Sequence, residues 1–144
     1  MKLKVAWIKA GGARSSAVEE LAVQYCKRIA AFARIETHEF KTEAALLKSL
    51  EKSSAKLIVL DSHGREFSSE QFAEWLRRQR DSSIDLIFTV GPADGFSDDA
   101  RRVASMQISL GKMTLPHELA RVVLLEQIYR AFTILAGHPY HLGH

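Results

Sequence analysis

The stretch Lys56-Leu57-Ile58-Val59-Leu60-Asp61 is a continuous apolar run between a lysine and an aspartate. A strand that is covered by helices on both faces of a sheet has no polar side, so such a run indicates a buried parallel strand. Leu86-Ile87-Phe88-Thr89-Val90 has the same character. The residues between these two runs have the spacing of an amphipathic helix. Together the two runs predict the centre of a parallel α/β sheet.

Strands and helices alternate outward from this pair over the whole chain, which favours one α/β domain spanning residues 1–144. Residues 62–65 are expected to form a loop. Pro116 fits the first position of a long helix, because its missing N–H costs nothing there. Ser15 or Ser16 is expected to cap a helix in a capping box with Glu19 or Glu20. Further strands are expected at 2–8, 33–40 and 106–110, and helices at 16–29, 42–53, 68–80, 97–104 and 116–136.

Composition excludes several classes of protein. The 144 residues are 47% hydrophobic and 26% charged, which is ordinary for a folded domain and argues against disorder or a fibrous repeat. Cys26 is the single cysteine, so no disulfide can form within the chain and a reducing compartment is expected. Apolar runs are too short for a membrane span, and the start of the chain is too weakly apolar for a signal peptide. We therefore expect a cytoplasmic protein without a membrane partner.

Three glycine-rich or small-residue loops follow predicted strands, at 60–64, 91–96 and 110–115. In an open parallel sheet, ligands bind beyond the carboxyl ends of the strands. Gly91 and Gly95 let a ligand approach the main chain, while Leu60, Met113 and Leu115 supply apolar walls. A nucleoside is a plausible guest, and ordinary turn chemistry is the alternative. Dinucleotide-binding and P-loop motifs are missing from the sequence.

The predicted long helix contains four apolar residues in a row, Val122 to Leu125, which spread around most of its circumference. A helix on the outside of a sheet needs only one apolar stripe. The surplus suggests packing against a second chain as well, and the alternative is burial within one chain. Arg121, Glu126 and Arg130 interrupt this surface, and a charge there is either paired or serves a site.

Histidines 138, 141 and 144 recur at intervals of three near the end of the sequence. Pro139 disrupts a helical register, and no cysteine or acid joins these histidines, so no metal site is expected. His117 follows Pro116 at a helix start, where a capping or loop role is the simpler interpretation.

Four segments carry a resemblance to a known family: Val90–Ser97, Leu110–His117, Arg121–Phe132 and His138–His141. They resemble the ribosomal RNA large subunit methyltransferase H family, which belongs to the SPOUT class of α/β-knot methyltransferases. The resemblance spans the chain and is most specific from residue 86 to residue 141. Pro92 departs from the pattern, since the family usually has a second glycine there. Leu142 also departs from it, since a basic residue often follows the final histidine of the motif.

The resemblance implies a parallel-sheet α/β-knot fold whose C-terminal part is threaded as a trefoil knot. It implies a homodimer that uses S-adenosyl-L-methionine to methylate N3 of a pseudouridine in large-subunit (23S-type) ribosomal RNA, free or in the assembled ribosome. Tyr140, His141 and His117 are then candidates for the catalytic base, with the tail folding over the cofactor. The cofactor-binding positions would be Leu60, Gly91, Gly95, Leu110, Gly111, Lys112, Met113, Thr114 and Leu115.

The charge distribution gains meaning if the substrate is RNA. Residues 1–80 carry 15 basic and 10 acidic side chains, whereas residues 81–144 carry 5 and 7, although scatter over a solvated surface would give a similar count. Candidate phosphate contacts are Lys2, Lys4, Lys9, Arg14 and Arg77. A SPOUT enzyme with a tRNA target, a non-catalytic RNA- or nucleotide-binding module, and a metal-binding regulator that uses the tail histidines are the alternatives.

Overall fold

The computed structural model describes residues 1–9, 15–92 and 94–142. Its centre is a five-stranded sheet in the order β2-β1-β4-β3-β5, in which every neighbouring pair is parallel. The predicted parallel α/β architecture is therefore confirmed. The strands are β1 (Lys2–Ile8), β2 (Arg34–Phe40), β3 (Lys56–Glu66), β4 (Leu86–Val90) and β5 (Met106–Ser109).

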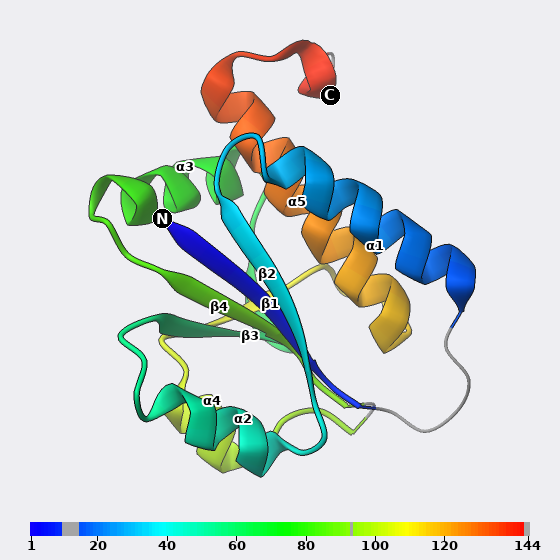
Figure 1. The fold of residues 1–144 in the computed structure, drawn as a ribbon, viewed down its shortest axis with the longest axis vertical. Coiled ribbons are helices and arrows are strands. Elements are labelled where there is room, and N and C mark those ends of the chain that lie inside the picture. The colour runs from blue at the N-terminus through cyan, green and yellow to red at the C-terminus, as the bar shows by residue number, and fades with distance from the viewer. Residues whose placement is uncertain (10–14, 93, 143–144) are drawn as a thin grey trace.

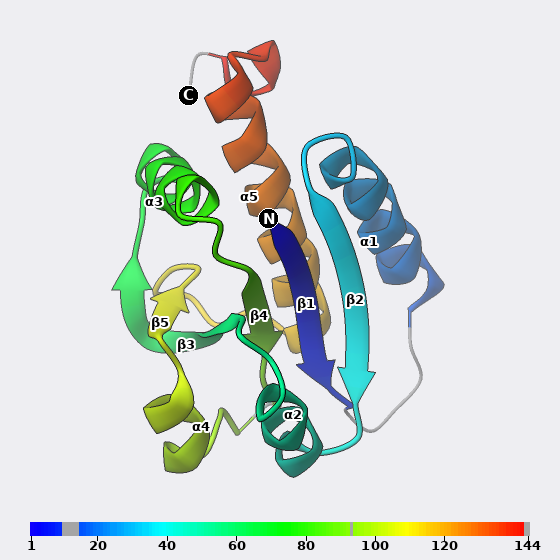
Figure 2. The ribbon, with the colours of Figure 1, turned by 60° about the vertical axis from the view of Figure 1, so that its left-hand side comes forward.

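Helices cover both faces of the sheet (Figures 1 and 2). One face carries α1 (Ser16–Ile29), α3 (Ser69–Asp81) and α5 (His117–Ala136). The other carries the shorter α2 (Glu43–Leu50) and α4 (Asp98–Val103). A short 3₁₀ helix, η1 (Pro139–His141), follows α5. In the described part of the chain, no helix combines the length and apolar character needed to cross a bilayer.

Alternation of side chains along the strands divides the core into two layers. Leu3, Val5 and Phe88 point toward α1, α3 and α5, and all three are fully buried. Ala6 and Ile87 point toward α2 and α4. Because both layers are apolar, the central strands read as continuous hydrophobic runs in the sequence.

Serine and threonine side chains cap α1, α2, α3 and α4, as their sequences predict. The hydroxyl of Ser68 accepts from the N–H of Gln71, and the Gln71 side chain accepts from the N–H of Ser68, which completes a capping box on α3. The capping box predicted for α1 is wrong. Ser15 is its N-cap, but the third helical residue is Val18, which has no carboxylate to return the bond.

The expected loop at residues 62–65 is also wrong, because β3 continues to Glu66 through a bulge. Both Leu60 and Arg65 stand opposite Ile108 of β5, so the residues between them protrude from the strand. Gly64 permits the return to the sheet, since a Cβ atom there would lie 2.7 Å from backbone atoms of Gln107 and Ile108. Only glycine allows β3 and β5 to approach so closely at this point.

The long helix α5 differs from expectation in two ways. Pro116 is its N-cap, so the first helical residue is His117. The helix lies between α1 and α3 as well as on the sheet, and Val122, Leu124 and Leu125 are buried within one chain. Packing inside one chain therefore accounts for much of its wide apolar surface, and the second chain stays a prediction.

Candidate functional site

A cleft of about 710 Å³ opens at the carboxyl edge of the sheet. Its walls come from the β3 bulge, the loop after β4, the loop after β5 and the start of α5. Most ligand pockets have volumes of about 300–1,000 Å³. The three loops that the sequence predicts to form a ligand site therefore line one cavity, which has room for a nucleoside-sized molecule.

Most of the predicted cofactor-binding residues line this cleft, and Lys112 does not. The side chains of Met113 and Leu115 are 87% and 38% exposed, so they present apolar surface to solvent at the edge of the cavity. His117, one of the three candidate bases, lies there too. The predicted residues in the lining are Leu60, Gly91, Gly95, Leu110, Gly111, Met113, Thr114 and Leu115.

The two glycines after β4 serve different purposes. Gly95 adopts a φ of 82°, a left-handed conformation that glycine takes readily, as the sequence suggested. Gly91 instead makes room for a neighbour. A Cβ atom at Gly91 would lie 2.7 Å from Cε2 of the buried Phe96 ring. The ring packs directly against the main chain of the loop and fixes its path along the cleft.

An ion pair that the sequence analysis missed anchors the β3 bulge. Arg101 Nε donates to Asp61 Oδ2 over 3.0 Å, and the backbone N–H of His63 donates to Asp61 Oδ1 over 2.9 Å. These contacts lower the pKa of the Asp61 carboxyl, the bond from the His63 backbone being the largest cause. All three residues line the cleft. An acid that ends a buried strand was the available signal for Asp61, whereas Arg101 is 40 residues away.

Tyr140 and His141 belong to η1, which follows the carboxyl end of α5, whereas the cleft is lined by residues at the start of that helix. Figure 1 shows the C-terminal segment at the far end of α5 from the helix start. The Tyr140 hydroxyl donates to Glu126 Oε1 over 2.9 Å, and His141 contacts Arg130 at 2.8 Å and Glu70 at 2.7 Å. Burial, and then the Glu126 carboxylate, raise the pKa of Tyr140. A helix of 20 residues is about 30 Å long. The tail therefore does not fold over the cleft of its own chain.

The three charges that interrupt the apolar surface of α5, Arg121, Glu126 and Arg130, are paired. Arg121, only 4% exposed, donates from Nη2 to Glu19 Oε1 over 2.6 Å and stacks on Trp7, with 4.1 Å between its guanidinium carbon and the ring centroid. Arg130 contacts Glu126 over 2.8 Å. Within residues 1–9, 15–92 and 94–142, no group of three or more His, Cys, Asp or Glu side chains is placed to hold a metal ion.

The candidate phosphate contacts are dispersed. Lys2 and Lys4 project from β1 on the face of α2 and α4, and Lys2 pairs with Glu36 at 3.3 Å. Arg77 lies on α3, across the sheet, where Glu74 and Asp81 neutralise it. Lys9 follows the carboxyl end of β1. Arg14 lies outside the described residues. The described members of this set, Lys2, Lys4, Lys9 and Arg77, do not gather on one surface.

Comparison with solved structures assigns the fold to a class of methyltransferases. A probable methylase family protein from Haemophilus influenzae aligns over 96% of this chain and 70% of its own, with a TM-score of 0.64 and 8% identity. A putative methyltransferase from Legionella pneumophila, solved with bound SAM, aligns over 91% of this chain and 66% of its own, with a TM-score of 0.52 and 17% identity. A family model described as a predicted SPOUT methyltransferase matches residues 1–141. The fold is that of a SPOUT methyltransferase.

Relatives with similar sequences identify the family within this class of methyltransferases. A ribosomal RNA large subunit methyltransferase H from Koribacter versatilis is 46% identical, over 100% of both chains. Its counterpart from Gloeobacter violaceus is 39% identical, over 98% of this chain and 100% of its own. This chain belongs to the ribosomal RNA large subunit methyltransferase H family. The trefoil knot that the resemblance implies stays a prediction.

Proposed function

We propose that this protein is a cytoplasmic enzyme that transfers a methyl group from S-adenosyl-L-methionine to N3 of a pseudouridine in large-subunit ribosomal RNA. One observation carries the proposal: the loops that the family resemblance assigns to the cofactor converge, in this chain, on a single cleft of about 710 Å³. Relatives named as ribosomal RNA methyltransferases match over the full length of the chain.

The residues of the cleft suit this cofactor. Leu60, Met113 and Leu115 offer apolar surface to the adenine ring, and an occupant would cover the strongly exposed Met113 side chain. The main chain of Gly91, Gly95, Gly111 and Thr114 offers N–H and C=O groups for orientation. The bound cofactor supplies a methyl group on a positively charged sulfur. Asp94, which also lines the cleft, favours a cation there, whereas Asp61 is already paired with Arg101.

The chain must position the acceptor and remove a proton. N3 of the base loses its proton, its electron pair forms the new N–C bond, and the S–C bond breaks with its electrons returning to sulfur. An imidazole accepts such a proton well. His117 is the candidate base that lies in the cleft of the same chain. Tyr140 and His141 act at a cleft only if a second copy of the chain brings its tail there.

A homodimer with shared sites is therefore part of the proposal. The test mixes two variants that are inactive alone, Met113→Arg in the cleft and Tyr140→Ala/His141→Ala in the tail. If each site uses residues from both chains, mixed dimers regain one intact site, and random mixing restores about a quarter of the wild-type rate. No recovery on mixing contradicts a shared site.

The function itself is tested by calorimetry and by mapping modified RNA. We expect one S-adenosyl-L-methionine molecule to bind per chain, and one methyl group to be lost from a single pseudouridine of ribosomal RNA in cells that lack the gene. The absence of cofactor binding contradicts an enzyme and favours a non-catalytic RNA- or nucleotide-binding module. Methylation of tRNA in place of ribosomal RNA contradicts the substrate and keeps the enzyme class.

A further inference from the structure

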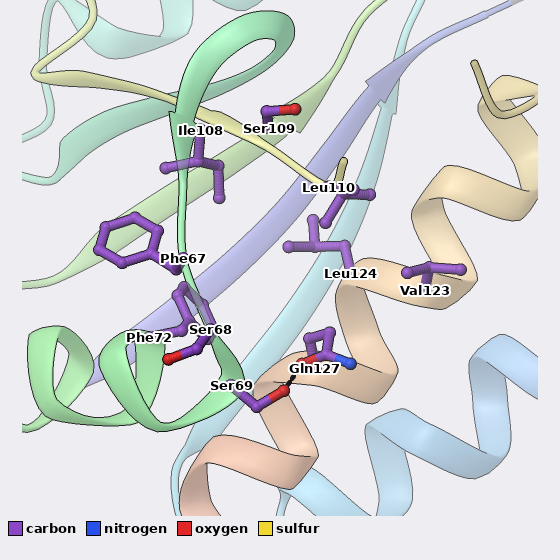
Figure 3. A pocket seen from close by; sticks show the side chains of 10 residues that line it. All are labelled: Phe67, Ser68, Ser69, Phe72, Ile108, Ser109, Leu110, Val123, Leu124 and Gln127. Atoms are coloured by element: carbon purple, nitrogen blue, oxygen red, sulfur yellow. Dashed lines mark hydrogen bonds between the residues drawn. The ribbon is translucent and has the colours of Figure 1, made fainter. Parts of the chain in front are cut away.

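A second, smaller pocket of about 180 Å³ lies beside the large cleft, between the start of α3, the end of β5 and the middle of α5 (Figure 3). Phe67 and Phe72 form one wall. At the far end, Ser69 Oγ donates to Gln127 Oε1 over 2.9 Å, which joins α3 to α5. The volume equals that of about six water molecules at roughly 30 Å³ each. It is too small for the cofactor and suits a single ring.

The pocket connects two parts of the molecule that otherwise lie apart. Ser109 and Leu110 line both it and the large cleft, so the two cavities share a wall. At its other end, Gln127 Nε2 donates to Glu126 Oε2 over 2.9 Å, and Glu126 is the residue that accepts from Tyr140. The second pocket thus lies between the cofactor cleft and the tail cluster, which consists of Glu126, Arg130, Tyr140 and His141.

The chemistry of the lining selects for a neutral, flat ligand. None of its side chains carries a charge, so a phosphate or a carboxylate would be poorly solvated there. Aromatic and aliphatic side chains supply the walls, and the hydroxyls of Ser68 and Ser69 with the Gln127 amide supply polar groups at one end (Figure 3). Gln127 Nε2 keeps a second N–H beyond its bond to Glu126, and an amide of this kind suits the oxygen and nitrogen edge of a base.

A positive charge lies next to the aromatic wall. The exposed Arg65 side chain stacks on Phe67, with 4.4 Å between its guanidinium carbon and the ring centroid. Single-stranded RNA is commonly held by aromatic rings and arginine planes that stack with bases, together with cations that contact the adjoining phosphates.

We propose that the second pocket receives the extruded pyrimidine base of the RNA substrate, with Gln127 at the edge of the base and Arg65 beside its phosphate. This proposal rests on the proposed function. A methyl acceptor must come within about 3–3.5 Å of the methyl donor, so its base must enter a cavity that adjoins the cofactor cleft. The shared wall at Ser109 and Leu110 meets that requirement.

The test compares Gln127→Met, which keeps the length of the side chain and removes its amide, with Gln24→Met on the exposed face of α1 as the matched control. We expect Gln127→Met to lower kcat/KM for ribosomal RNA about 10-fold or more, as the loss of a buried hydrogen bond to substrate does. Calorimetric affinity for S-adenosyl-L-methionine should stay within about two-fold. Arg65→Gln should weaken RNA binding and reduce the dependence of log K on log salt by about one unit.

A third measurement locates the base directly. In an RNA stem-loop with 5-bromouridine at the target position, ultraviolet light should cross-link that base to Phe67 or Phe72. A cross-link confined to other residues overturns the proposal. So does a Gln127→Met variant that methylates RNA as fast as Gln24→Met, or one that loses cofactor affinity to the same extent as RNA turnover. If the wild-type protein neither binds the cofactor nor methylates ribosomal RNA, the proposed function itself has failed.

Discussion

Gly91→Ala tests whether the loop after β4 is shaped by its contact with Phe96. The new Cβ atom would lie 2.7 Å from Cε2 and 2.9 Å from Cδ2 of a ring that is only 4% exposed. The ring packs in the core layer of α2 and α4 with Ala100, so it has little room to withdraw. Overpacking a rigid core of this kind costs about 1–3 kcal/mol. Because Gly91 lines the cleft, cofactor affinity should fall as well.

The assay is urea denaturation of four proteins: the wild type, Gly91→Ala, Phe96→Leu and the double variant. Leucine at position 96 removes the atoms that the new methyl group would meet, so the double variant should be more stable than the sum of the single effects predicts. We expect a coupling free energy of about 1 kcal/mol or more, whereas independent sites add within about 0.5 kcal/mol. A neutral Gly91→Ala, or simple additivity, refutes the packing argument.

Three further predictions concern charged and titrating groups. Glu19→Ala should destabilise the fold by about 1–3 kcal/mol in denaturation, because it leaves a buried guanidinium without its carboxylate, and Arg121→Met should cost less. The lowered pKa of Asp61 stabilises the fold above the ordinary value of 3.8, so the wild type should lose stability as pH falls below about 4, and Asp61→Asn should lack that loss. The raised pKa of Tyr140 keeps its phenol protonated near neutral pH, so Tyr140→Phe should slow methylation without changing the shape of the pH–rate profile; disappearance of one limb would contradict this.

Local patterns were sufficient to predict the sheet. The runs at 56–61 and 86–90 identify two buried strands without reference to any distant residue. A helix is predicted between them, and a helical connection of this kind joins parallel strands. The spatial order was not predictable in this way, because the position of β4 between β1 and β3 depends on contacts across the whole domain. The β3 bulge was missed for a similar reason, since it depends on the approach of Gly64 to the β5 main chain.

The cleft was predictable from the ends of the strands, whereas its charges were not. Asp61 meets Arg101 across 40 residues, and Arg121 meets Glu19 across 102. No spacing rule relates residues so far apart. The position of the tail could have been predicted from the length of the helix before it. A helix of 20 residues separates its two ends by about 30 Å, which keeps the tail away from the cleft. The distance from His117 to Tyr140 already argues against one compact site in one chain.

The polar residues of α5 show why this helix has no ordinary solvent face. Arg121 meets Glu19 of α1, Gln127 meets Ser69 of α3, and the pair Glu126 and Arg130 meets the tail, so each polar position faces a different neighbour. The buried apolar residues between them pack against α1, α3 and the sheet. The apolar run from Val122 to Leu125 spreads over more than one face of the helix, which is why the sequence suggested a second chain. The same arrangement places the large cleft, the second pocket and the C-terminal tail in sequence along one helix.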